Sequence, residues 1–145
     1  MRIVRSILTL QTIDALRELV KFNHGAAIPD QPLDPDWDAL ARIRPWLWVA
    51  QEGAKAVGYC AHMLTASHLF TGEKFSTCAA IYMLPAFRAY VPRMIAQIER
   101  ELRQEGVQVI NYSVPHMSRA GAFFEAVGYE CTELVMTKRF QVEAI

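Results

Sequence analysis

The sequence predicts one domain of the α/β (α+β) class, in which a mixed, mostly antiparallel central sheet of about six strands carries helices on both faces. The chain has 145 residues, of which 52% are hydrophobic, and a chain of this size can bury one full core. Apolar runs and amphipathic segments follow one another in the order β-α-α-β-β-β-α-β-α-β. We therefore expect residues 1–145 to form a single domain without a linker.

The first part of the chain predicts a strand and a helix. Arg2–Leu8 is a short apolar run typical of a strand. Thr12 is the expected N-cap of a helix that runs to about Asn23, and Gly25 ends it. The following segment up to Trp46 contains four prolines, which predicts a loop with one short helix near Asp36–Ile43.

The middle of the chain predicts an antiparallel meander. The segment WLWVAQEGAKAVGYCAHML has the pattern of two strands joined by a turn at Glu52–Lys55, where Gly53 tolerates a positive φ angle. Phe75–Leu84 is a further apolar run and predicts the third strand of the meander. A helix is expected from about Pro92 to Glu105, because its apolar residues recur at offsets of three and four.

The last part of the chain predicts a strand, a helix and a final strand. Gly106 ends the preceding helix, and the run VQVINYSV is expected to pair in parallel with Phe75–Leu84 through the helical crossover. Ser118 is the expected N-cap of a helix to Ala126. Gly128 ends this helix, and Cys131–Phe140 is expected to form the last strand.

Composition disfavours several classes of function. Lys plus Arg and Asp plus Glu both number 15, so the chain lacks the positive excess that nucleic acids attract. No apolar run is long enough for a membrane span, and the N-terminus does not have the pattern of a secretory signal. Cys60, Cys78 and Cys131 each lie in an apolar run, which predicts buried, reduced thiols and no metal site. The default location is the cytoplasm.

Three motifs, in this order and spacing, resemble the GNAT superfamily of acyl-CoA-dependent N-acetyltransferases, particularly its short bacteriophage-type members. The motifs are IYMLPAFR at a strand end, IERELRQEGV before a strand, and AGAFFEAVGYE in the last helix. The resemblance covers nearly the whole chain. It implies that acetyl-CoA is the cosubstrate and that an amine, of unknown identity, accepts the acetyl group.

The resemblance also implies where coenzyme A binds, because in this family the turn after the fourth strand and the following helix N-terminus hold the pyrophosphate. In the family this turn usually contains glycines, whereas Val91 and Arg93 occupy those positions here. Pro92 removes a further amide donor, while Arg88 and Arg93 offer guanidinium groups to a phosphate. The implied cofactor-binding residues are Met83, Leu84, Arg88, Ala89, Tyr90, Val91, Arg93 and Met94.

The catalytic groups that the resemblance implies are not at their usual positions. The fourth strand contains no carboxylate to serve as a base, and Phe124 occupies the position of the usual tyrosine acid. Candidate substitutes are two phenols, which could reach the thioester sulfur, and a histidine with a suitable pKa for a base. These catalytic candidates are Tyr82, Tyr112 and His116.

Several other residues of chemically interesting type are expected to have structural roles. Tyr82 and Cys78 are expected on the same face of their strand, with Cys78 a buried and inert thiol. His62 and His68 are expected to be structural or solvated, while the resemblance to phage-type members leaves open that His68 faces the acceptor. The tryptophans are expected to fill the core beside the irregular segment; they are Trp37, Trp46 and Trp48.

Two classes of function stay open on the sequence. The first is an active N-acetyltransferase. The second is a catalytically inactive phage protein with the same scaffold, which binds another macromolecule or serves as a structural component of the virion; a small-molecule binding module without turnover is a weaker third. The location of a phage protein would be the host cytoplasm or the virion. The sequence leaves open whether the chain forms a homodimer and whether it binds another protein.

Overall fold

The computed structural model describes residues 1–7, 9–27, 41–42, 44–65, 72–114, 118–138 and 140–141, without the side chains of residues 10 and 21–27. The chain forms two compact units, Met1–Tyr112 and Ser113–Ile145. The expected loop and short helix between residues 26 and 46 lie mostly outside the described residues, although residues 41–42 are helical.

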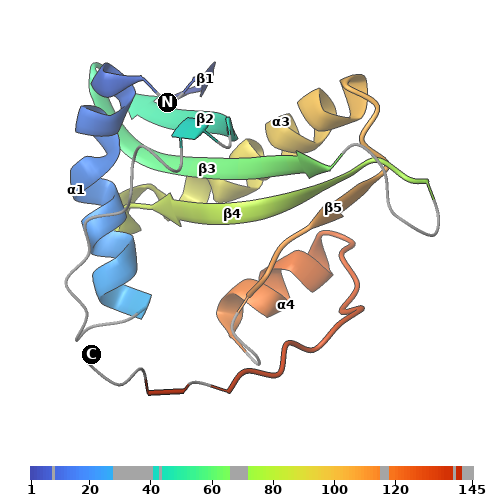
Figure 1. The fold of residues 1–145 in the computed structure, drawn as a ribbon. Helices are drawn as coiled ribbons and strands as arrows, with labels where there is room; N and C mark the ends of the chain where they lie inside the picture. The colour runs from blue at the N-terminus through green and yellow to red at the C-terminus, as the bar shows by residue number, and fades with distance from the viewer. Residues whose placement is uncertain are drawn as a thin grey trace. The chain divides into compact units, whose positions relative to one another are not determined.

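The first unit is built on a mixed sheet of five strands in the order β1-β2-β3-β4-β5 (Figure 1). The first four strands form an antiparallel meander, and β5 pairs with β4 in parallel, as the sequence predicts. The mixed, mostly antiparallel fold class is therefore confirmed, with five strands among the described residues in place of the expected six or so. The strands are β1 Arg2–Ser6, β2 Trp46–Glu52, β3 Lys55–Thr65, β4 Phe75–Met83 and β5 Val109–Asn111.

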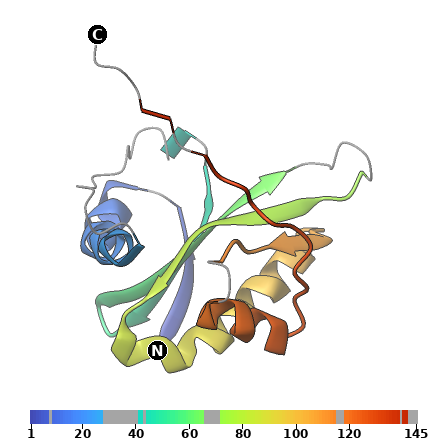
Figure 2. The ribbon, with the colours of Figure 1, turned by 90° about the horizontal axis from the view of Figure 1, so that it is seen from below.

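A helix covers each face of this sheet, and the two helices lie on opposite sides of it in Figure 2. Helix α1, Leu10–Ala27, packs Leu16 and Leu19 on one face, which we call the α1-side core. Helix α3, Val91–Gln104, covers the other face with its apolar stripe, which we call the α3-side core. The α1-side core comprises Leu16, Leu19, Leu47, Val49 and Tyr59, and the α3-side core includes Trp48, Val57, Cys60, Met83, Met94, Ile98 and Leu102.

Helix α3 is fixed to the sheet by both apolar and polar contacts. Met94, Ile98 and Leu102 have no exposed surface, which places the predicted stripe of the helix in the core. The indole N–H of Trp48, a fully buried residue of β2, donates a hydrogen bond to the carboxylate of Glu101. This bond satisfies the one polar atom of the indole ring inside the core. Within the described part of the chain, no helix has the length and apolarity that a membrane crossing requires.

One extra residue in β4 sets the direction of its side chains. Ala61 opposes Ala80, but the next residue of β3, His62, opposes Cys78, so Ala79 is a bulge without a partner. Cys78 consequently packs against the α3-side core, whereas Tyr82 packs against the α1-side core. The expectation that these two residues share a face is wrong, because the bulge reverses the alternation between them.

The start of α1 also differs from the prediction. The helix begins at Leu10, and Thr9, not Thr12, has the capping role, because the Thr9 hydroxyl accepts a hydrogen bond from the amide of Thr12 at 3.3 Å. Two threonines three positions apart both fit a cap, and the local sequence does not separate them. The helix also continues through Gly25 to Ala27, so this glycine does not end it.

In the second unit, helix α4 covers Arg119–Ala126 and has the predicted caps. The Ser118 hydroxyl accepts a hydrogen bond from the amide of Gly121 at 3.2 Å. Gly128 has a φ angle of +98°, and the amide of Tyr129 donates to the carbonyl of Phe124. Both ends of this helix are therefore specified by the local sequence.

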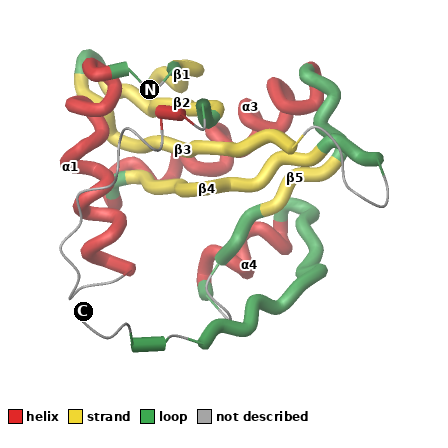
Figure 3. The backbone as a smooth tube through the Cα atoms, in the orientation of Figure 1, coloured by secondary structure: helices red, strands yellow, loops and turns green. Residues whose placement is uncertain are grey.

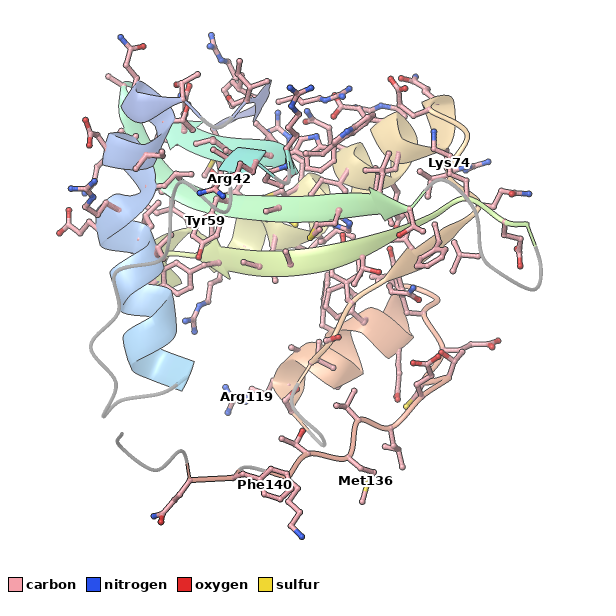
Figure 4. The ribbon with its side chains drawn as sticks, in the orientation of Figure 1. Arg42, Tyr59, Lys74, Arg119, Met136 and Phe140 are labelled. Atoms are coloured by element: carbon pink, nitrogen blue, oxygen red, sulfur yellow. The ribbon has the colours of Figure 1, made fainter. Side chains whose placement is uncertain are left out.

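The predicted last strand, Cys131–Phe140, is wrong. Its described residues carry no strand assignment and follow α4 as loop (Figure 3). Met136 and Phe140, labelled in Figure 4, are 89% and 78% exposed. An apolar run makes a strand only when its backbone groups find a ladder partner, and in the described residues this segment has none. Cys131 is accordingly an exposed thiol, contrary to the expectation of burial.

A close approach between β3 and β4 makes Gly58 a testable feature of the sheet. A Cβ atom at this position would lie 2.5 Å from the Met83 sulfur and 2.9 Å from the Tyr82 carbonyl oxygen. We expect Gly58→Ala to lower the free energy of unfolding by about 1–3 kcal/mol, because the backbone of β4 must move. Chemical denaturation monitored by circular dichroism measures the change.

A matched control is Gly53→Asn in the hairpin turn, where φ is +61° and a Cβ atom would meet no other atom within 4 Å. Asparagine tolerates this conformation, so we expect a cost below about 1 kcal/mol. Equal losses in the two variants would contradict the proposed steric origin.

Candidate functional site

Strand β5 pairs along its whole length with only the first three residues of β4, and this leaves the rest of β4 with an unpaired edge. The pairing joins Phe75–Thr77 to Val109–Asn111. Beyond it, Cys78–Met83 of β4 has no partner among the described residues on the side away from β3 (Figure 1). Alternate residues of this segment direct their N–H and C=O groups to that side. The edge can therefore form hydrogen bonds with an extended ligand that carries amide groups.

A polar chain crosses the α3-side core at the point where β4 and β5 separate. His62 of β3 is fully buried, with its Nδ1 atom 2.7 Å from the Ser76 hydroxyl and its Nε2 atom 3.1 Å from the Tyr112 hydroxyl. The rings of His62 and Tyr112 are perpendicular, with centroids 5.1 Å apart. Both nitrogens of the imidazole are thus satisfied inside an apolar environment.

The burial of His62 determines its charge. Desolvation lowers the pKa of His62 from its ordinary value of 6.5 to about 4. The ring is therefore neutral near pH 7, with one nitrogen donating a hydrogen bond and the other accepting one. A neutral ring between two hydroxyls orients both of them. Of the structural or solvated placement that the sequence suggested for His62, the structure excludes the solvated one, and the hydrogen bond to Tyr112 was not anticipated.

Tyr112 and Tyr82, the two phenols predicted from the sequence, lie on different faces of the sheet. Tyr112 directly follows Asn111, the last residue of β5 that pairs with β4, and packs against the α3-side core. Tyr82 opposes Tyr59 in the ladder and packs in the α1-side core with it. Figure 4 shows Tyr59 on the side of the sheet that α1 covers. The structure therefore does not bring the two phenols together at one site.

The segment that follows β4 is helical from Pro85 onward. A 3₁₀-helix, η1, covers Pro85–Tyr90 and continues directly into α3. The amide of Val91 donates to the carbonyl of Arg88, and Pro92 has no N–H, so neither residue offers an amide donor to a phosphate. The side chains of Arg88 and Arg93 are exposed and keep their guanidinium donors accessible.

The other predicted cofactor-binding residues have mixed environments. Met83 and Met94 are 3% and 0% exposed, so their side chains belong to the core and only their main chain could contact a ligand. Leu84 and Val91 are half-buried against the α3-side core, and Ala89 and Tyr90 are exposed.

Two cysteine thiols lie next to His62. The sulfur atoms of Cys60 and Cys78 are 3.8 Å apart, on neighbouring strands. Burial, followed by the hydrogen bond and the charge interaction with Cys78, raises the pKa of the Cys60 thiol well above its usual value. A protonated, buried thiol is a poor nucleophile, so Cys60 is not a candidate for covalent catalysis.

The remaining candidates are placed only in part. His116, His68 and Trp37 lie outside the described residues. Trp48 fills the α3-side core, as expected of a tryptophan beside a strand. Trp46 is half-buried and carries the guanidinium of Arg5 at 3.5 Å from its ring centroid.

The pair of Ser76 and His62 was missed by sequence reasoning. Each is a polar residue inside an apolar run, and that is the signal that could have singled them out. Their proximity depends on the register of β3 against β4, and the bulge at Ala79 shifts that register without a mark in the sequence.

The lowered pKa of His62 predicts an acid-sensitive fold. The unfolded chain binds a proton at this histidine below pH 6.5, whereas the folded chain binds it only below about pH 4. The free energy of unfolding should therefore decrease as the pH falls from 6.5 to 4, by up to about 3 kcal/mol from this residue. Urea unfolding of the wild type across this range measures the decrease.

The comparison with His62→Gln isolates this histidine, because the carboxylates titrate in both proteins. The variant should be less stable at pH 7 and should show a shallower dependence on pH, so that the difference between the two proteins shrinks toward pH 4. Parallel curves for the two proteins would show that His62 binds its proton at the same pH in the folded and the unfolded chain, which contradicts a lowered pKa.

No protein-family model matches the sequence, and no curated protein is similar to it in sequence. Among solved structures, an aminoglycoside acetyltransferase, meta-AAC0020, from an uncultured soil metagenomic sample in complex with sisomicin is similar with a TM-score of 0.75. That match has 13% identity and covers 98% of this chain and 96% of the other.

Two further structures show the same likeness. The aminoglycoside N-acetyltransferase AAC(6')-Iy in complex with CoA has a TM-score of 0.70 at 18% identity, with 97% of this chain and 100% of the other covered. An acetyltransferase of Trypanosoma brucei has a TM-score of 0.69 at 16% identity, with coverages of 96% and 100%. The chain therefore shares its fold with these acetyltransferases, which agrees with the fold that the sequence motifs suggested.

Proposed function

We propose that this chain is an N-acyltransferase, which transfers an acetyl group from acetyl-CoA to an amine. The observation that carries the proposal is the unpaired edge of β4, Cys78–Met83, which leads directly into η1 and the start of α3. A thioester donor needs a place for an extended arm with amide groups and a place for phosphates. The β4 edge could hold the arm, and the start of α3, which follows it in the chain, could hold the phosphates. The likeness to an acetyltransferase in complex with CoA supports the same assignment.

The residues present fit coenzyme A in an altered form. The main-chain groups of Cys78–Met83 would pair with the amides of the donor's arm, as a strand added to an open sheet edge does. Neither Val91 nor Pro92 offers an N–H group to a phosphate, so the guanidinium groups of Arg88 and Arg93 would hold the phosphates. Arginine side chains would thus replace the backbone amides of the glycine-containing turn that the family usually has.

Tyr112 is the proton donor in the proposed reaction. The amine attacks the thioester carbonyl carbon, the C–S bond breaks, and the leaving sulfur takes the Tyr112 hydroxyl proton. A main-chain N–H of the β4 edge stabilises the negative charge on the carbonyl oxygen. The Nε2–H of His62 donates to the Tyr112 oxygen at 3.1 Å and so stabilises the phenolate that forms. The Ser76 hydroxyl, 2.7 Å from Nδ1, holds this tautomer.

The acceptor must be a neutral amine, and we keep His116 as the candidate base that takes its proton. No carboxylate of β4 competes for this role, because the strand reads FSTCAAIYM. A structurally similar acetyltransferase was solved in complex with sisomicin, which supports an amine of a small molecule as the acceptor class. A cytoplasmic location is part of the same proposal, and the homodimer stays open.

The second candidate is a scaffold without turnover, as in a phage protein with a binding or structural role. The loss of amide donors at Val91 and Pro92 favours it, because a weaker phosphate site lowers the affinity for the donor. The two candidates differ in one measurable property, which is saturable binding of acetyl-CoA followed by transfer.

Calorimetric titration with acetyl-CoA tests the binding site. We expect saturable binding, and we expect Arg88→Ala to weaken it by about 1–3 kcal/mol through the loss of charged hydrogen bonds. Arg100→Ala, an exposed arginine later in the same helix, is the matched control and should leave the affinity unchanged. If Arg88→Ala bound as tightly as the control, the phosphate site would lie elsewhere, and no binding at millimolar acetyl-CoA would exclude the enzyme.

Substitution of each phenol distinguishes the proposed acid, Tyr112, from the alternative acid, Tyr82. Once an amine acceptor is found, Tyr112→Phe should lower kcat by about 10²–10⁴-fold, because the thiolate loses its proton donor. Tyr82→Phe, on the opposite face of the sheet, should retain kcat. A reversed pattern in folded variants would move the acid to Tyr82, and release of free coenzyme A measures both rates.

A further inference from the structure

Two thiols and an imidazole converge inside the first unit, beside the proposed catalytic chain. The ligand atoms of Cys60, His62 and Cys78 all lie within 4.8 Å of one another. Cys60 and His62 are two positions apart on β3 and share its α3-facing side, and the bulge at Ala79 brings Cys78 of β4 to the same side. Nothing in the acyl transfer proposed above uses the two sulfur atoms.

We propose that Cys60, His62 and Cys78 form a binding site for a thiophilic divalent cation, such as Zn²⁺. The 3.8 Å between the two sulfur atoms is the observation that points to a cation. Two thiolates at about 2.3 Å from a tetrahedral zinc ion are separated by about 3.8 Å. The sulfur atoms are therefore already at the separation that zinc requires.

The same geometry disfavours a disulfide between these cysteines. A disulfide needs an S–S distance of about 2.05 Å and closely opposed Cα atoms. Cys60 opposes Ile81 in the ladder, and Cys78 opposes His62, so the two cysteines are not partners across the strands. A disulfide would require the two sulfur atoms to move about 1.8 Å closer together, whereas zinc coordination requires the separation that they already have.

The charge balance of the site also favours a divalent cation. Binding releases the two thiol protons to solvent, and two thiolates, a neutral imidazole and M²⁺ then sum to zero net charge. A neutral complex avoids the cost of an unpaired charge in the α3-side core. Sulfur and imidazole ligands select Zn²⁺ or Co²⁺ over Mg²⁺ and Ca²⁺, which prefer oxygen.

The surroundings provide an entry path and an outer hydrogen bond. Cys78 is half-buried and is the first residue of the unpaired β4 edge, so a cation reaches the site from there. His62 gives one ring nitrogen to the cation, and the other nitrogen keeps its hydroxyl partner, Ser76 or Tyr112. Such an outer hydrogen bond fixes the tautomer and orientation of a ligating histidine.

Cobalt spectroscopy on the full chain tests the site, with Cys131→Ala as the starting protein because Cys131 is an exposed thiol. We expect Co²⁺ to produce a thiolate-to-cobalt charge-transfer band and the visible bands of tetrahedral cobalt. Zn²⁺ should remove both sets of bands by displacement, and Mg²⁺ should leave them unchanged. Native mass spectrometry should find one zinc ion per chain.

Substitutions within the site assign the ligands. In the Cys131→Ala protein, Cys60→Ala and Cys78→Ala should each abolish tight binding, and His62→Gln should weaken it about tenfold or more while keeping the thiolate band. Circular dichroism establishes that each variant is folded. Cys78→Ala is the variant least disruptive to packing, because Cys78 is half-buried whereas Cys60 is fully buried.

Two results would overturn the proposal. One is the absence of a charge-transfer band in folded Cys131→Ala protein at millimolar Co²⁺. The other is undiminished affinity for Co²⁺ and Zn²⁺ after both Cys60 and Cys78 are replaced, which would place the cation on other ligands. These measurements need no acetyl-CoA. They can therefore exclude the cation site without affecting the proposed acyltransferase activity, and the acetyl-CoA titration can exclude that activity without affecting the cation site.

Discussion

A single residue of β4 without a ladder partner, Ala79, determines which β4 side chains lie on each face of the sheet. On its N-terminal side, Ser76 and Cys78 face the α3-side core and meet His62 from β3. On its C-terminal side, the alternation is reversed, and Tyr82 faces α1. A regular strand would place Cys78 and Tyr82 on one face, since a shift of one position moves each side chain to the other side of a sheet. The polar chain and the thiol pair therefore both depend on this bulge.

The buried polar chain is consistent with an apolar core only because every member has a partner. His62 lies among Trp48, Cys60 and Tyr112, and its edge-on contact with the Trp48 ring has a centroid separation of 5.7 Å. An unsatisfied imidazole nitrogen in such a place would cost about 1–3 kcal/mol. Two hydroxyls remove that cost and at the same time fix the orientation of Tyr112. Stability and the proposed chemistry thus use the same hydrogen bonds.

Elements that are specified locally could be predicted from the sequence, and elements that depend on distant partners could not. Gly53 at the hairpin turn, Ser118 at the start of α4 and Gly128 at its end each act within a few residues, and the structure has them as predicted. The apolar stripe of α3 is periodic and was also predictable. The bulge at Ala79 arises from the fit between two strands, and the failure of Cys131–Phe140 to form a strand depends on whether a partner edge exists. The site residues Ser76 and His62 belong to this second group, because only the register of β3 and β4 joins them.

Both proposals use the imidazole ring of His62. Its two nitrogens have three possible partners, which are the Ser76 hydroxyl, the Tyr112 hydroxyl and a cation. Ser76 and Tyr112 each hold one nitrogen in the structure, and a cation would have to replace one of these hydroxyls. A cation that replaces Ser76 leaves the Tyr112 hydroxyl bonded to the ring and compatible with proton donation. A cation that replaces Tyr112 removes the stabilisation of the phenolate and should inhibit acyl transfer. The effect of Zn²⁺ on a transfer assay would therefore identify the nitrogen that binds it: an unchanged rate at saturating Zn²⁺ assigns the Ser76 side of the ring, and inhibition that Cys78→Ala abolishes assigns the Tyr112 side.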